Sequence, residues 1–136
     1  MQNYYQLAID EKQNSDDPKT QVGAVIVLND KIISKSANIL PPRLNVEVVS
    51  ENRYHVIEHA ERAAIFKAEE MLDGATIYCT RFPCVDCARA ISFSGITKAT
   101  FQTGIEKDSP WAESQYAAED IMKKSNIEIV IGFENG

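Results

Sequence analysis

Two different periods of hydrophobic and polar positions follow one another along the chain, and each change of period marks a predicted element. Apolar residues recur at helical spacing over residues 4–14, 57–72, 84–93 and 111–124, which predicts four helices. Runs rich in β-branched or aromatic residues predict strands over 22–28, 31–36, 75–80, 98–102 and 127–131. The turn residues Asn29 and Asp30 indicate that the first two strands form an antiparallel hairpin.

The order of these elements predicts an α/β fold. After the hairpin, helices and strands alternate, which favours parallel pairing of the later strands through right-handed crossovers. We therefore expect a five-stranded mixed sheet with helices on both faces, a three-layer α/β/α arrangement. The length of 136 residues fits one domain, residues 1–136, and no repeat or linker interrupts it.

The segment from residue 38 to residue 52 has no regular pattern. Pro41 and Pro42 exclude a helix there, and an irregular loop of this length is uncommon in a compact domain unless it is functional. We expect it to form the rim of a ligand site, with Asn38 and Arg43 on it. Gly23, early in the first strand, indicates either a close approach of another segment or a simple bulge.

Composition and net charge restrict the kinds of molecule that this protein is expected to bind. The chain is 44% hydrophobic and 25% charged, which is ordinary for a globular domain, and its net charge is −6. An acidic domain is a poor match for a nucleic-acid backbone, although one or two arginines would suffice for a small phosphorylated ligand. We see no signal peptide and no apolar run long enough to span a membrane, so we expect a cytoplasmic protein.

The three cysteines suit a metal or redox site better than a disulfide framework. Cys84 and Cys87 are three positions apart at the start of a predicted helix, so they lie on one face of it. His59 lies near the start of the preceding helix, and the two helix N-termini are expected to meet at one end of the sheet. One imidazole and two thiolates are a typical zinc ligand set that leaves a fourth position for water. A thioredoxin-like redox pair or a structural zinc site would use the same cysteines.

Glu61 lies two residues from His59, too close in sequence to be a comfortable second ligand from the same turn. A metal held by two thiolates and a neutral imidazole carries no net charge, so it acidifies water only modestly and needs a base beside it. We assign Glu61 as the general acid and base that moves a proton from water to a leaving amine.

The motifs H-A-E and P-C-x-x-C together are typical of zinc-dependent nucleobase deaminases. The chain resembles the cytidine/deoxycytidylate deaminase superfamily, and within it the dCMP deaminase branch, over residues 17–27, 58–65, 82–91 and 111–114. The resemblance implies Zn²⁺ held by His59, Cys84 and Cys87, with Glu61 as proton shuttle. It also implies the cytidine-deaminase-like fold, a homo-oligomer, and a sugar contact by Asn38.

Two features depart from the family pattern. Ala63 stands where the family commonly has Asn, and the segment around Ser36 and Ala37 lacks the usual Gly-aromatic pair. Both concern the substrate and leave the metal set and Glu61 unchanged. The candidate substrate-binding residues are Asn38, Arg43, Ala60 and Phe82.

Several of these side chains have either a functional role or a purely structural one. Arg43, Arg53 and Arg62 are candidate phosphate contacts, or simply solvated arginines. Phe82 either lines the base pocket or packs in the core, whereas Trp111 is expected to pack in the core or a subunit interface rather than to stack on a base. We expect Cys79 in the core and His55 on the surface.

These observations favour deamination of a cytosine nucleotide, dCMP or CMP, to the uracil nucleotide and ammonia. The alternatives are a deaminase acting on a free base, a nucleoside, guanine or a modified pyrimidine, and a catalytically silent zinc-stabilised binding domain. A tRNA adenosine substrate agrees less well with the acidic charge. We expect a small-molecule nucleotide as the partner, with no membrane and no nucleic acid.

Overall fold

The computed structural model describes residues 3–132. Its elements in chain order are α1 (Tyr4–Glu11), the 3₁₀ helix η1 (Lys12–Asn14), β1 (Gly23–Leu28), β2 (Lys31–Ala37), α2 (Arg53–Val56), α3 (Ala60–Lys67), β3 (Thr76–Cys79), α4 (Val85–Ser94), β4 (Lys98–Phe101), α5 (Ala112–Lys124) and β5 (Glu128–Ile131). No helix within residues 3–132 has both the length and the apolar character needed to cross a membrane.

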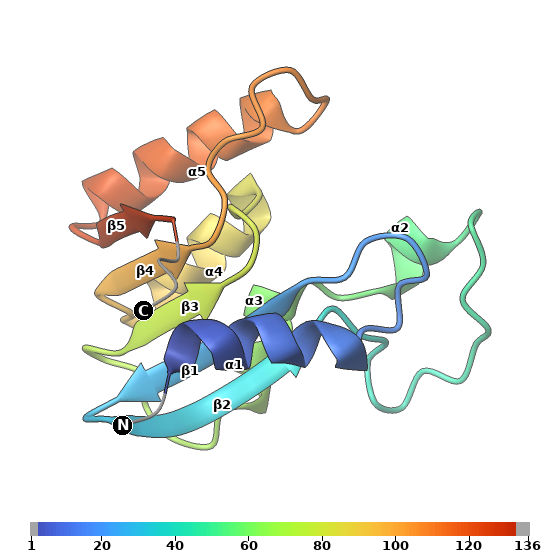
Figure 1. Ribbon diagram of the computed structural model, residues 1–136, viewed down its shortest axis with the longest axis horizontal. Coiled ribbons are helices and arrows are strands. Elements are labelled where there is room, and N and C mark those ends of the chain that lie inside the picture. The colour runs from blue at the N-terminus through green and yellow to red at the C-terminus, as the bar shows by residue number, and fades with distance from the viewer. Residues whose placement is uncertain (1–2, 133–136) are drawn as a thin grey trace.

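The five strands form one mixed sheet in the order β2-β1-β3-β4-β5. β1 is antiparallel to both β2 and β3, while β3, β4 and β5 are parallel to one another. Figure 1 shows α1 in front of the sheet, with α3 and α4 behind it. The predicted hairpin, the parallel half of the sheet and the three-layer α/β/α arrangement are therefore confirmed.

Apolar side chains on the two faces of the sheet form two hydrophobic clusters. The larger one joins alternate residues of the strands, such as Ile26, Ile77 and Phe101, to α3, α4 and α5. The smaller one lies under α1 and contains Ala8, Val25 and Val27. β1 contributes to both clusters, which explains why its sequence reads as a continuous apolar run rather than an alternating one.

Gly23 lies where α1 crosses the first strand. A Cβ atom at this position would lie 2.0 Å from the carbonyl oxygen of Ala8, so any side chain would push the helix away from the sheet. The irregularity of the hairpin falls instead between Ile26 and Val27. Of the two readings of this glycine, close approach is the one that the structure supports.

The helix predicted over residues 57–72 is shorter than expected. Residues 57–59 are extended, because Ile39 and Glu58 form a β-bridge in which each N–H donates to the other's carbonyl at 3.1 and 2.8 Å. The helix begins after His59 and ends before Ala68, which is itself extended. The predicted irregular segment is confirmed, since neither a helix nor a strand occurs between β2 and α2.

Candidate active site

The three predicted metal ligands lie at two neighbouring helix N-termini. His59 is the N-cap of α3, Cys84 is the N-cap of α4, and Cys87 lies in the first turn of α4. Both helices follow extended segments on the same side of the sheet, and the larger hydrophobic cluster holds them together. Tertiary packing therefore brings an imidazole and two thiols together across a large gap in sequence.

The spacing of the ligand atoms fits a tetrahedral zinc site. Nδ1 of His59 lies 3.5 Å from Sγ of Cys84 and 3.3 Å from Sγ of Cys87. A tetrahedral zinc ion with ordinary bond lengths would separate a nitrogen and a sulfur ligand by about 3.5 Å. Within residues 3–132, these three residues are the one group of three or more His, Cys, Asp or Glu side chains that could hold a metal ion. The chain thus offers three ligand atoms close enough together to share one ion.

The two cysteines interact strongly with each other. The hydrogen bond with Cys87, together with His59, lowers the pKa of Cys84 to about 4 despite its burial. The same hydrogen bond and burial raise the pKa of Cys87 well above its ordinary value. A metal takes both cysteines as thiolates, so its binding competes with the proton that burial favours on Cys87.

Glu61 lies in the first turn of α3 and is 4% exposed. Burial raises the pKa of this carboxyl, while the nearby His59 partly opposes the shift. A buried carboxyl whose pKa is raised beside a metal set is suited to accepting and returning a proton. It lines the same cleft as His59 and Cys84.

The cleft has a volume of about 360 Å³, at the lower end of the range for small-molecule sites. Of the candidate substrate contacts, Asn38, Ala60 and Phe82 line it, whereas Arg43 is exposed and is not among the lining residues. Phe82 is also packed against Phe101, with ring centroids 5.0 Å apart. Phe82 therefore lines the cleft and also packs in the core, and its contact with a base stays a prediction.

The side-chain amide of Asn38 forms hydrogen bonds within the chain. Its Oδ1 accepts hydrogen bonds from the N–H of Val22 at 3.0 Å and from the hydroxyl of Ser15 at 2.6 Å, while Nδ2 donates to the carbonyl of Thr20 at 2.8 Å. The side chain therefore ties the end of β2 to the segment before β1. Its contact with a sugar stays a prediction.

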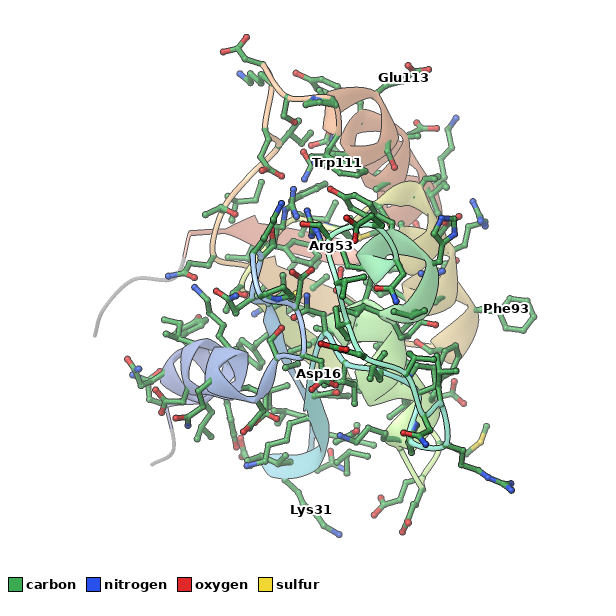
Figure 2. All side chains as sticks on the ribbon, turned by 90° about the vertical axis from the view of Figure 1, so that its right-hand side faces the viewer. Asp16, Lys31, Arg53, Phe93, Trp111 and Glu113 are labelled. Carbon is green, nitrogen blue, oxygen red and sulfur yellow. The ribbon has the colours of Figure 1, made fainter. Side chains whose placement is uncertain are left out.

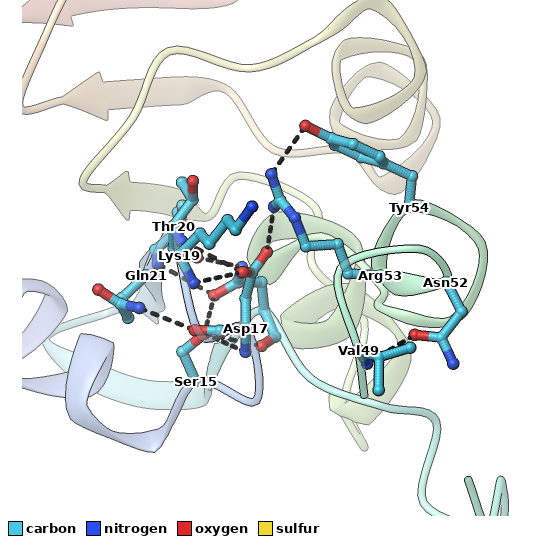
Figure 3. A network of polar contacts seen from close by, with 11 residues as sticks. Ser15, Asp17, Lys19, Thr20, Gln21, Val49, Asn52, Arg53 and Tyr54 are labelled. Carbon is cyan, nitrogen blue, oxygen red and sulfur yellow. Dashed lines mark hydrogen bonds and ion pairs between the residues drawn. The ribbon is translucent and has the colours of Figure 1, made fainter. Parts of the chain in front are cut away.

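Among the three candidate phosphate contacts, Arg53 alone lines the cleft. Its Nη1 donates to Asp17 at 3.0 Å and its Nη2 donates to the hydroxyl of Tyr54 at 2.8 Å (Figure 3). The carboxylate of Asp17 also accepts from the N–H groups of Lys19 and Thr20. Arg53 thus anchors α2 to the segment before β1.

Arg62 is not among the residues that line the cleft, and it bridges the two helices that carry the predicted ligands. Its Nε lies 2.7 Å from Glu58 and its Nη1 lies 4.0 Å from Asp86. Glu58 also accepts a hydrogen bond from the N–H of His59 at 3.0 Å. Arg62 therefore connects Glu58, the residue before His59, to Asp86, one of the two residues between Cys84 and Cys87.

Several lining residues were not predicted from the sequence, namely Asp17, Thr20, Tyr54, Arg81, Asp86, Ser114 and Gln115. Asp17 lies within the segment 17–27 that carries the family resemblance, so a signal for it was available. Trp111 was expected in the core or an interface. In this chain it is 42% exposed and lines the cleft, near Arg53 on the face shown in Figure 2. Cys79 is buried and His55 is exposed, as predicted.

Comparison with known proteins agrees with this geometry. The family model for the cytidine and deoxycytidylate deaminase zinc-binding region matches residues 1–103. A relative from Aliivibrio fischeri, an uncharacterized deaminase in the luxG 3' region, is 33% identical over 130 residues, covering 93% of this chain and 88% of its own. Human deoxycytidylate deaminase is 34% identical over 108 residues, or 71% of this chain and 61% of the human protein.

The fold has a counterpart among solved structures. The dCMP deaminase of the cyanophage S-TIM5 superposes with a TM-score of 0.76 at 24% identity, covering 94% of this chain and 93% of the other. Fold and site together define a zinc-dependent hydrolytic deaminase. The chain belongs to the cytidine and deoxycytidylate deaminase family.

Proposed function

We propose that this protein removes the amino group of a cytosine nucleotide, dCMP or CMP, giving the uracil nucleotide and ammonia. The observation that carries the proposal is the buried carboxyl of Glu61, which lines a cleft of small-molecule size beside His59 and Cys84. Human and mouse deoxycytidylate deaminases, at 34% and 32% identity, support cytosine nucleotides as the substrate class.

The roles of the residues follow from their positions. A zinc ion held by His59, Cys84 and Cys87 would supply a Lewis acid that makes water a better nucleophile at neutral pH. Glu61 accepts a proton from the attacking water and delivers it to N3 of the pyrimidine as oxygen adds to C4. It then carries the second proton of that water to the amino group, the C4–N bond breaks, and ammonia leaves.

Arg53 is the candidate contact for the phosphate. A guanidinium has five N–H donors, and those to Asp17 and Tyr54 use two of them. A phosphate can therefore bind Arg53 without displacing either partner. Asn38, Ala60 and Phe82 are proposed to contact the nucleoside. A single domain that assembles into a homo-oligomer in the cytoplasm also remains part of the proposal.

A substrate without a phosphate is the second candidate. Both arginines that line the cleft are already paired with carboxylates, Arg53 with Asp17 and Arg81 with Glu106. Ala63 in place of the usual Asn points in the same direction. The silent binding domain is disfavoured, because the ligand group found among the described residues has three members and two of them face the cleft.

Ammonia release by the zinc-loaded protein tests the proposal directly. dCMP, CMP, deoxycytidine, cytidine and cytosine are offered at equal concentrations, and we expect release from the two nucleotides first. Faster release from the nucleosides would select the second candidate. No release from any of the five compounds, with zinc content verified, would contradict a cytosine deaminase.

A further inference from the structure

Two aromatic side chains from distant parts of the chain meet at the cleft. Tyr54 lies in α2, and Trp111 is the residue immediately before α5. Both line the cleft, and their ring centroids are 6.0 Å apart at an angle of 48°. The pair therefore connects α2, which follows the irregular segment, to the start of α5.

Neither ring is part of the hydrophobic core. Tyr54 is 66% exposed and Trp111 is 42% exposed, and neither belongs to either hydrophobic cluster. Large aromatic surface that stays in water next to a buried general base gains free energy when a ligand covers it. Core packing within this chain therefore does not account for these two side chains, and their place in the cleft favours ligand contact.

An arginine supports each ring. The guanidinium carbon of Arg53 lies 4.4 Å from the centroid of Tyr54, and that of Arg81 lies 5.9 Å from the centroid of Trp111. Both distances fall within the range of cation–π contacts. Each ring is thus in contact with a guanidinium while part of its surface remains exposed.

The supporting arginines are themselves fixed by carboxylates. Arg53 is held by Asp17, while Arg81 forms two hydrogen bonds to Glu106 at 3.0 and 3.2 Å. Glu106 in turn accepts from Gln115 in α5 at 2.8 Å. These contacts tie Arg53 to the segment before β1 and Arg81, through Glu106, to α5. The aromatic pair is therefore held in place before a ligand arrives.

We propose that Tyr54 and Trp111 form an aromatic wall that packs against the nucleoside part of the substrate and sets its affinity. This inference rests on the proposed function for the identity of the ligand, a pyrimidine nucleotide. The aromatic wall takes no part in proton transfer, which belongs to Glu61. It acts on substrate binding and leaves the chemical step unchanged.

Trp111 is the single tryptophan of the chain, so its fluorescence reports on the wall directly. Zinc-loaded wild-type protein is titrated with dUMP, the proposed product, which is not consumed. We expect a saturable change in emission and reduced quenching by acrylamide as the ligand covers the indole. An emission spectrum that stays the same at saturating dUMP would contradict the contact.

Steady-state kinetics provide the second test. Trp111→Ala and Tyr54→Ala should each raise the KM for dCMP by about five- to a hundredfold, the range for losing one aromatic–base contact, while kcat stays within about twofold. Trp111→Phe and Tyr54→Phe should recover most of the affinity. Phe93→Ala is the matched control, because Phe93 is 96% exposed on α4 and does not line the cleft. A thermal melt of each variant verifies that α5 and α2 remain folded.

The outcomes separate this inference from the proposed function. If the wild type deaminates dCMP and both alanine variants match its KM, the aromatic wall is wrong and the function stands. If dUMP changes the Trp111 emission but no cytosine compound is deaminated, the wall stands and the function is wrong. A protein that neither binds dUMP nor deaminates any cytosine compound contradicts both.

Discussion

The floor and the rim of the cleft are built in different ways. The floor carries the proposed metal ligands and Glu61 at the starts of α3 and α4, where fully buried alanines such as Ala60, Ala64 and Ala88 pack. The rim, residues 38–58, is largely exposed and has α2 as its one helix. Side-chain contacts such as Asn38 to Val22 and Arg53 to Asp17 hold it in place.

This difference predicts which properties can change independently. The floor residues are positioned by the helices that carry them and by apolar packing among many residues. Their chemistry therefore depends on the whole fold. The rim is positioned by a few polar contacts, so single substitutions there can alter substrate choice without altering the metal set. Variants of the two regions should therefore fall into separate kinetic classes, kcat for the floor and KM for the rim.

The largest effect is expected at the floor, from Glu61→Gln. The amide keeps the shape of the side chain but cannot accept the proton, so kcat should fall by about 100- to 10,000-fold. Zinc content and the unfolding midpoint should remain near the wild-type values, because Glu61 is not assigned as a ligand. Elemental analysis and ammonia release measure the two quantities on the same sample.

A variant that keeps more than a tenth of the activity would remove Glu61 from the mechanism. A variant that loses its zinc would instead place this carboxylate among the ligands. Cys87→Ser provides the contrast, since it alters the ligand set itself and should lose both metal and turnover.

The next largest effect is expected at the rim, from Arg53→Gln. The KM for dCMP should rise by roughly tenfold or more, about 1.4 kcal/mol, whereas the KM for deoxycytidine should rise less, because deoxycytidine loses only the support that Arg53 gives to Tyr54. The unfolding free energy should fall by about 1–2 kcal/mol, because Asp17 loses its charged partner but keeps the hydrogen bonds from the N–H groups of Lys19 and Thr20. Chemical denaturation and kinetics with both substrates measure these changes.

Adding Asp17→Asn to Arg53→Gln separates the two roles. The double variant should regain part of the lost stability, since the unpaired buried charge is gone, but it should not regain affinity for the phosphate. If the KM for dCMP and the KM for deoxycytidine rise by the same factor in the single variant, Arg53 acts only by holding α2.

The sequence was informative about the floor and much less so about the rim. Helix and strand periods placed every element of the sheet and the helices beside it, and residue chemistry selected His59, Cys84 and Cys87, which the fold brings together. Local periodicity could not reveal that Glu58 pairs with Ile39 across the chain, which shortened the predicted helix.

The rim contacts were missed for a related reason. Asp17 and Arg53 are 36 positions apart, and an ion pair between distant side chains leaves no periodic signal in the sequence. Trp111, at the start of a predicted helix, was expected in the core or a subunit interface; its exposure in this chain contradicts the core, and the interface stays a prediction. Its place in the cleft depends on where the segment before α5 lies relative to α2, which tertiary structure alone decides.

The Asp17–Arg53 pair should also make the stability of the rim depend on pH. Burial works to raise the pKa of Asp17, but hydrogen bonds from the N–H groups of Lys19 and Thr20 and the charge of Arg53 outweigh it, so the pKa lies below its ordinary value. The stabilisation is present above the unfolded-state pKa of about 3.9 and is lost as the pH falls through the lower folded-state value.

Urea denaturation of the wild type and Asp17→Asn at a series of pH values tests this. The wild type should be the more stable protein at pH 6, and the gap should narrow as the pH falls below about 4. Both proteins share the metal site, so its own protonation cancels in the difference. A gap that stays constant or widens at low pH would show that the carboxylate is not stabilised by its partners.

The smallest effect is expected for Arg43→Ala, which also sharpens the boundary of the rim. Arg43 was predicted to contact the substrate, yet it is exposed and does not line the cleft. An exposed side chain away from buried contacts usually changes stability by less than about 0.5 kcal/mol, so the unfolding midpoint should hardly move. The KM for dCMP should also stay within about twofold if Arg53 is the cation that meets the phosphate. A clear rise in KM for dCMP but not for deoxycytidine would mean that the segment carrying Arg43 folds over the bound nucleotide, and that the rim is assembled only with substrate present.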